Sequence, residues 1–158
     1  MHLLRYYFQK YPEDADNVII SIKGALGLKH EPTGGPDALR ASVDKAYVVL
    51  KGIKTIDVFE MARVDPTIPI ETSVKALAEL VAEGKIGGIG LSEVSASTIR
   101  RANAIHKVAA VEVEMSLFTP DPLHNGILDA CRERKSHGPS TQQLVQADIA
   151  VAKLIFWW

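Results

Sequence analysis

The sequence contains a single cysteine and has almost no net charge. Because Cys131 is the only thiol among 158 residues, no disulfide can form within the chain, and a reducing compartment such as the cytoplasm is expected. The formal net charge is −1 and the isoelectric point is about 6.5, so electrostatics gives no reason to expect nucleic acid or an anionic membrane as a partner. Neither kind of binding is therefore expected.

The chain also lacks a long uninterrupted apolar run. Arg5 and Lys10 interrupt the apolar residues at the N-terminus, which leaves no core for a signal peptide. The apolar segment 144–158 contains Asp148 and Lys153 and is too short to span a bilayer, for which roughly 20 apolar residues are needed. With 47% hydrophobic residues, the chain is instead long enough for one globular domain with its own core.

Patterns typical of metal centres and of nucleophilic catalysis are missing as well. The histidines do not occur at metal-ligand spacing with one another or with Cys131. No Gly-x-Ser-x-Gly arrangement is present. Glu112 and Glu114 share one face of an expected strand, but no donor or nucleophile stands near them in the sequence. We therefore expect no bound metal.

Glycines gather in the stretch AEGKIGGIGLSE at 82–93. A phosphate-binding loop needs its glycines between a strand and a following helix. Here a segment with helical periodicity, 68–84, comes first, so Gly84 is expected to end a helix. Residues 86–93 then form a short apolar strand, in which the glycines either allow close packing or admit a ligand near the backbone.

Segments with strand and helix patterns alternate along the whole chain. The patterns predict strands at 17–24, 54–63, 86–93 and 108–118, and helices at 36–52, 68–84, 96–106 and 123–134. Such alternation implies parallel pairing through crossover connections, because a tight turn cannot join parallel strands. The expected class is α/β, either an open doubly wound sheet or part of a (β/α) barrel, since a complete eight-fold barrel needs about 250 residues.

Three further residues are expected to mark helix ends. Asp37 and Ser95 are of the types that cap the first turn of a helix. Gly52 follows the last apolar position of its helix and is expected to end it.

Four motifs, in order, resemble one family. They are SIKG at 21–24, IDVFEMARVDP at 56–66, EGKIGGIGLSEVS at 83–95 and AAVEVEMSLF at 109–118. Together they resemble the aldo-keto reductases, most closely the fungal pyridoxal reductase branch, over about Leu3 to Arg132. The resemblance implies a partial (β/α) TIM-type barrel of about four parallel strands over 1–133, with a divergent tail at 134–158. It also implies reduction of a small aldehyde such as pyridoxal to an alcohol, with NADPH as the hydride donor.

The resemblance assigns roles to four residues. Lys23 matches the catalytic lysine, whose positive charge favours ionisation of a neighbouring tyrosine phenol and so makes it a better proton donor. Ser92 matches the residue that bonds the nicotinamide carboxamide. Glu93 and Glu112 stand where the broader family usually has Asn and Gln, also beside the carboxamide. Asp57 matches a position at the start of a strand that we interpret as structural.

The sequence departs from the family pattern at several positions. Ala62 occupies the position of the tetrad histidine, and alanine cannot donate a proton to a carbonyl oxygen. The early segment with the tetrad aspartate and tyrosine, and the strands that would bind the adenosine phosphate, have no counterpart in the chain. The tyrosines that are present lie in other segments: Tyr6, Tyr7, Tyr11 and Tyr47.

Two functional interpretations follow. The first is an aldo-keto reductase in its complete form, with the 158-residue chain itself inactive. The second is a non-catalytic half-barrel that acts as an oligomerising or binding module. Four parallel strands leave two open edges, and such edges favour self-association.

Overall fold

The computed structural model describes residues 1–115, 118 and 120–133, so the tail predicted at 134–158 lies outside the described residues. The described elements, in chain order, are α1 (His2–Lys10), η1 (Pro12–Asp14), β1 (Ser21–Gly24), α2 (Pro36–Leu50), β2 (Val58–Met61), α3 (Ile70–Ala82), β3 (Ile89–Ser92), α4 (Ala96–Ile105), β4 (Val108–Glu112), η2 (Asp121–Leu123) and α5 (Ile127–Arg132).

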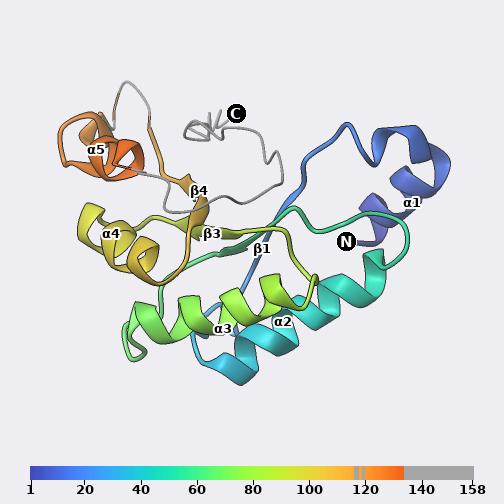
Figure 1. The fold of residues 1–158 in the computed structure, drawn as a ribbon, viewed down its shortest axis with the longest axis horizontal. Helices are drawn as coiled ribbons and strands as arrows, with labels where there is room; N and C mark the ends of the chain where they lie inside the picture. Colours follow the sequence, from blue (N-terminus) through green and yellow to red (C-terminus); the bar gives the residue numbers. More distant parts are fainter. Residues whose placement is uncertain (116–117, 119, 134–158) are drawn as a thin grey trace.

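The four strands form one parallel sheet in the order β1-β2-β3-β4. Lys23 of β1 stands beside Glu60 of β2, and Ser92 of β3 stands beside Glu112 of β4. The register between β3 and β4 shifts by one residue after Ile89. A helix follows each of the first three strands, which confirms the predicted α/β class with parallel pairing (Figure 1).

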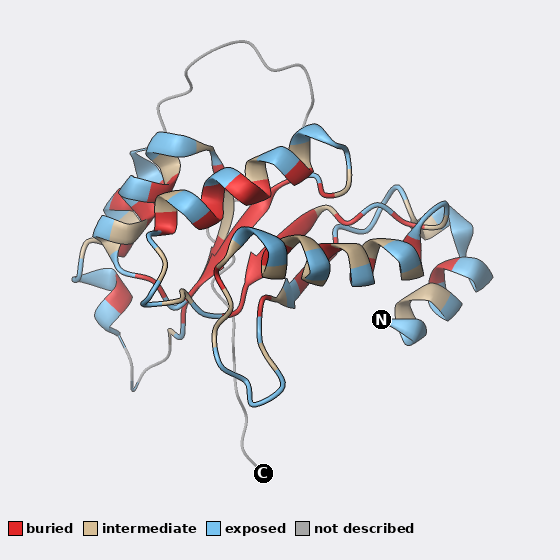
Figure 2. Cartoon of the chain, turned by 90° about the horizontal axis from the view of Figure 1, so that it is seen from below, coloured by how far each residue is buried: buried red, intermediate tan, exposed pale blue. Residues whose placement is uncertain are grey.

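Helices α2, α3 and α4 lie side by side against one face of the sheet (Figure 1). In Figure 2 the buried residues of these helices face the strands, whereas their outer sides are exposed. Each large apolar side chain buried in this way stabilises the fold by about 1.5–3 kcal/mol. The layer between helices and sheet is built from fully buried residues that include Leu39, Val43, Leu77, Leu80, Phe59, Met61, Ile89 and Leu91.

Alternation along each strand places a different set of residues on the opposite face. Phe59 and Met61 belong to the apolar core, so Glu60 between them points the other way. The same alternation puts Lys23, Ser92 and Glu112 on the face away from the helices. That face is therefore the polar one, and it carries the residues selected from the sequence.

The predicted helix ends are correct in three cases and wrong in one. Gly84 and Gly52 have positive φ values of 71° and 73°, a conformation that glycine adopts without strain, and α3 and α2 end just before them. The Oγ of Ser95 accepts a hydrogen bond from the backbone N of Thr98, as expected of a helix cap. Asp37 is not the cap, because α2 already begins at Pro36.

The start of α2 explains that correction. Its N-cap is Gly35, and Pro36 occupies the first helical position, where a fixed φ and a missing N–H carry no penalty. Asp37 therefore lies inside the first turn, where its charge complements the helix dipole.

Close packing accounts for two of the clustered glycines. A Cβ at Gly87 would lie 2.8 Å from the backbone oxygen of Asp57, and a Cβ at Gly90 would lie 2.9 Å from the Cβ of Glu60. Both distances are shorter than real Cβ atoms show, so glycine at these positions lets β3 and the residues before it lie close to β2 and the residues before it. Within the described residues, no helix is both long and apolar enough to cross a membrane.

Candidate functional site at the carboxyl ends of the strands

The four residues selected from the sequence meet at one edge of the sheet. Ser92 and Glu112 are the last residues of β3 and β4, Glu93 follows β3 directly, and Lys23 is next to last in β1. Because parallel strands all end at the same edge, their terminal residues lie close together. This is also the edge at which barrel enzymes place their active sites.

Lys23 has carboxylates on two sides. Its Nζ donates a hydrogen bond to Oε1 of Glu112 at 2.6 Å and lies 3.2 Å from Oε1 of Glu60. Burial favours a lower pKa for Lys23, but the hydrogen bond with Glu112 and the charge of Glu60 outweigh it, so the pKa lies above its usual value. The side chain remains 37% exposed, so the ammonium is both charged at neutral pH and partly open to solvent.

Ser92 is buried, with 1% of its surface exposed. Nη1 of Arg63 lies 3.4 Å from the Oγ of Ser92 and donates a hydrogen bond to the backbone oxygen of Ala62 at 2.6 Å. Arg63 thus brings a second positive charge to the edge that holds Lys23.

Glu93 ties the end of β3 to β4. Its backbone N donates to the backbone oxygen of Glu112 at 2.8 Å, and its Oε1 accepts from the backbone N of Glu114 at 2.8 Å. Its φ of 53° lies in the left-handed region, which is uncommon for residues other than glycine and persists only where surrounding contacts enforce it. The carboxylate of Glu93 is therefore engaged with the backbone of its own chain.

Sequence reasoning missed Glu60. This residue is only 3% exposed, and Oγ of Ser21 donates to its Oε2 at 3.3 Å. Burial raises the pKa of the Glu60 carboxyl, and the neighbouring charge of Lys23 opposes part of that rise. The available signal was a glutamate in the middle of an otherwise apolar strand, since β2 is buried along its whole length.

Tyr7 and Tyr47 make their side-chain contacts away from Lys23. The hydroxyl of Tyr7 donates to Oδ2 of Asp14, and this hydrogen bond raises the pKa of the phenol, opposite to the direction that proton donation to a substrate requires. The ring of Tyr47 lies under Nζ of Lys51, 5.7 Å from the ring centroid. Within the described residues, the ionic partners of Lys23 are the carboxylates of Glu60 and Glu112.

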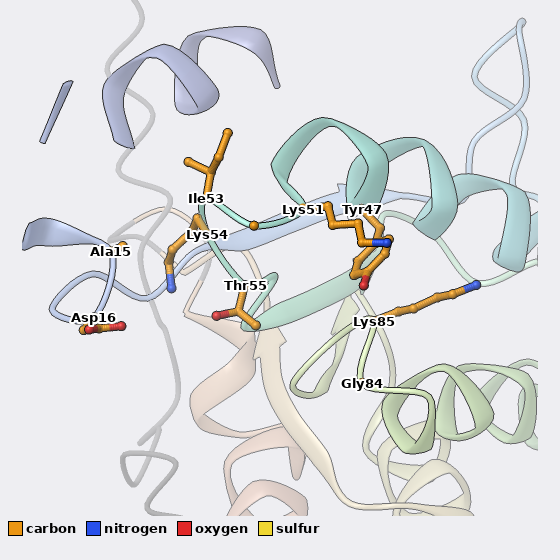
Figure 3. Close-up of a pocket in the computed structure, with 10 residues that line it drawn as sticks. Ala15, Asp16, Tyr47, Lys51, Ile53, Lys54, Thr55, Gly84 and Lys85 are labelled. Atoms are coloured by element: carbon orange, nitrogen blue, oxygen red, sulfur yellow. The ribbon is translucent and has the colours of Figure 1, made fainter. Parts of the chain in front are cut away.

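A hollow lies at the amino ends of the strands and is lined by several lysines (Figure 3). Its volume is about 320 Å³. Lys54 pairs with Oδ2 of Asp57 at 2.7 Å, and Lys85 pairs with Oδ1 of Asp44 at 2.7 Å, while Figure 3 shows their side chains extending in opposite directions. Lys54 and Lys85 therefore form ion pairs within the chain, and their ammonium groups do not point toward one shared binding position.

Asp57, predicted to be structural, belongs to this amino-terminal end. Its Oδ2 accepts from the backbone N of Ile20 at 2.8 Å in addition to Nζ of Lys54. One carboxylate thus joins the residues that precede β1 and β2. In the part of the chain that the structure describes, no three His, Cys, Asp or Glu residues are grouped so that they could hold a metal ion.

Strands that alternate with helices in a parallel sheet, with a lysine at the carboxyl end of β1, are the arrangement expected of part of a (β/α) barrel. The aldo/keto reductase family model matches residues 2–139, and the chain belongs to this family. The match covers most of the chain, so the family assignment does not depend on any single motif.

Two yeast relatives are similar in sequence. The chain is 48% identical over 134 residues to probable pyridoxal reductase 2 of Schizosaccharomyces pombe, covering 84% of this chain and 40% of the relative. It is 44% identical over 140 residues to the putative pyridoxal reductase of Saccharomyces cerevisiae, covering 80% of this chain and 39% of the relative. The chain thus spans about two fifths of the length of these curated relatives.

Solved structures with the same fold support a partial barrel. A thermostable aldo-keto reductase in complex with the inhibitor epalrestat superimposes with a TM-score of 0.65 at 23% identity, over 80% of this chain and 46% of that chain. A glycerol dehydrogenase from Gluconobacter oxydans gives 0.69 at 20% identity, over 81% and 41%. The four parallel strands therefore form part of a (β/α) barrel with an unclosed sheet, which confirms the predicted fold.

Proposed function

We propose that the chain is part of an NADPH-dependent oxidoreductase that reduces a small aldehyde, of the pyridoxal type, to an alcohol. The observation that carries the proposal is the Lys23 ammonium, held by two carboxylates at the carboxyl end of a barrel strand. Family membership and the similarity to two yeast pyridoxal reductases support it. The proposed setting is the cytoplasm, on the ground that the chain has one cysteine.

Lys23 supplies charge in this proposal and does not itself exchange a proton with the substrate. A cation near a phenol stabilises the phenolate, lowers the phenol pKa and makes the phenol a stronger acid toward a carbonyl oxygen. The resemblance assigns that phenol to an early segment that has no counterpart in this sequence. Ala62 cannot take over the donation.

The residues at this edge fit only the nicotinamide end of NADPH. When bound, NADPH would supply the hydride. The Ser92 hydroxyl lies at the edge where the carboxamide is expected, and the carboxylates of Glu93 and Glu112 can accept hydrogen bonds from an amide NH2. Glu93 and Glu112 already accept hydrogen bonds, from the backbone N of Glu114 and from Lys23 respectively. Oγ of Ser92 also accepts a hydrogen bond, from Nη1 of Arg63 at 3.4 Å, but its hydroxyl can still donate to the carboxamide oxygen, which an ionised carboxylate cannot do. Ser92 is therefore the best candidate of the three to contact the carboxamide.

The 158-residue chain alone is expected to be inactive. A positioned proton donor contributes about 10²- to 10⁴-fold to rate, and orientation of the cofactor adds more. We expect no NADPH-dependent reduction of pyridoxal above buffer and no saturable quenching of tryptophan fluorescence by NADPH. Turnover that disappears in Lys23→Met would contradict this expectation and would mean that another residue of the chain donates the proton.

A chimera tests the function itself. The segment of probable pyridoxal reductase 2 that aligns with this chain is replaced by the corresponding 134 residues, and circular dichroism verifies folding. We expect NADPH-dependent reduction of pyridoxal, with the parental relative as the positive control. A folded chimera without turnover, beside an active parent, would contradict the proposed function.

The open sheet favours a second candidate function, a half-barrel that associates with another copy. Among the described strands, β1 and β4 each pair on one side only, and unpaired edges attract further strands. Two copies joined from β1 to β4 would bring together eight parallel strands, the number in a complete barrel. Sedimentation at several concentrations should then show a dimer, and a folded monomer throughout would count against association.

A further inference from the structure

Glu60 is the most deeply buried ionisable group at the carboxyl-terminal edge, and the motif-based roles leave it without an assignment. Its side chain is 4% exposed, compared with 31% for Glu112. In the sheet register Glu60 stands directly beside Lys23, and its Oε1 lies 3.2 Å from Nζ. A buried carboxylate on the central β2 strand therefore faces a half-exposed ammonium on the neighbouring strand.

Neighbouring residues leave room for Glu60 and hold it. Oγ of Ser21 donates to Oε2 from β1, the strand that also carries Lys23. On the other side, β3 has Gly90, where a Cβ would approach Cβ and Cγ of Glu60 to 2.9 Å and 3.0 Å. The hydroxyl of Ser21 thus holds the Glu60 carboxylate, and the absence of a side chain at Gly90 leaves room for the glutamate stem.

Stability gives no reason for a carboxylate at this position. β2 is buried along its length, and an apolar side chain would suit such a strand. Burial raises the pKa of Glu60, which means that the ionised form is less favourable in the folded chain than in water. A glutamate that opposes folding but contacts a cation at the proposed site indicates a role in the chemistry.

We propose that Glu60 is a positioning residue, which holds the ammonium of Lys23 at the carboxyl end of the sheet. A lysine side chain has a long flexible stem, and one hydrogen bond to the partly exposed Glu112 restrains it from one side only. The buried Glu60 adds a fixed point on a second strand and keeps the ammonium charged. This role rests on the proposed reductase function, because it serves the lysine that would act on the phenol.

The titration of Lys23 in the 158-residue chain tests the proposal directly. With ¹³C-labelled lysine, NMR follows each ammonium with pH, and loss of one signal in Lys23→Arg assigns Lys23. In Glu60→Gln we expect the pKa of Lys23 to fall by about one pH unit, a tenfold loss of proton affinity, because one flanking negative charge is gone. Glu60→Asp keeps the charge but shortens the stem, so its shift should lie between those of Glu60→Gln and the parent.

Glu71→Gln is the matched control. It neutralises a surface carboxylate whose Oε1 lies 2.7 Å from Nε of Arg101, and it should leave Lys23 unchanged. A folded Glu60→Gln chain in which Lys23 titrates as in the parent would overturn the proposal, and Glu60→Asp decides the same question if Glu60→Gln does not fold. An inactive chimera would remove the reductase function without altering this titration, so the two failures are distinguishable.

Discussion

Lys54 and Lys23 meet carboxylates beside the same two strands, β1 and β2, but at opposite ends of the sheet. At the amino end, Nζ of Lys54 lies 2.7 Å from Oδ2 of Asp57, and the lysine side chain is 3% exposed. At the carboxyl end, Lys23 contacts Glu60 and Glu112, and its side chain is 37% exposed. Both lysines contact carboxylates, but the side chain of Lys23 is much more exposed to solvent than that of Lys54.

The difference in exposure indicates that the charge of Lys54 stabilises the fold, whereas the charge of Lys23 can act on another molecule. Asp57 uses one oxygen for both Lys54 and the backbone N of Ile20, so the amino-terminal pair joins the approaches to two strands. Removing one partner of such a pair leaves the other charge buried without compensation. At the carboxyl end, Lys23 would keep Glu112 and solvent if Glu60 were neutralised.

Asp57→Asn should have the largest effect on stability. It leaves the Lys54 ammonium buried beside a neutral amide, and breaking a buried pair in this way costs about 3–5 kcal/mol. Urea unfolding followed by circular dichroism measures the change, and a loss below about 1 kcal/mol would mean that the amino-terminal pair does not hold the fold.

Gly87→Ala and Gly90→Ala compare the two ends through packing. At Gly87 the new Cβ meets the backbone oxygen of Asp57 at 2.8 Å, and backbone cannot move aside; at Gly90 it meets the side chain of Glu60. Overpacking typically costs about 1–3 kcal/mol, so we expect Gly87→Ala near the upper value and Gly90→Ala near the lower. Thermal unfolding shows which variant loses more stability. A larger loss in Gly90→Ala than in Gly87→Ala would contradict a more rigid amino-terminal end.

Glu60→Gln should have the smallest effect on stability, within about 1 kcal/mol of the parent at neutral pH, since Lys23 is not left buried and unpaired. The pH dependence carries a sign. The folded pKa of Glu60 lies above its ordinary 4.5, so the unfolded chain loses this proton first as pH rises, and the parent loses stability relative to Glu60→Gln above pH 4.5. Unfolding at several pH values checks the trend, and a parent that gains on the variant with rising pH would refute it.

Features set by short-range sequence pattern could be predicted. Gly52 and Gly84 end their helices because the apolar periodicity stops there and glycine accepts a positive φ. The order of strands follows from their alternation with helices. Asp37 was assigned wrongly as a cap, because the fixed φ of the preceding Pro36 lets the helix begin two residues earlier than a cap at Asp37 would allow.

The site could be predicted only in part, since its contacts depend on register and burial. Lys23 and Glu112 lie 89 residues apart in the chain, and their hydrogen bond exists because β1 and β4 end at one edge of the sheet. Glu60 was overlooked because its pairing with Lys23 depends on how β1 and β2 align. The sequence places a glutamate in an apolar strand but does not say which cation it meets.

Turnover by Lys23→Met in the chimeric barrel tests the central claim, that the half-exposed lysine is the one that serves the reaction. We expect kcat for pyridoxal reduction to fall at least about 100-fold, because the phenol loses the cation that favours its ionisation, while the thermal midpoint changes little. A folded Lys23→Met chimera that keeps the turnover of its unsubstituted parent would contradict the account.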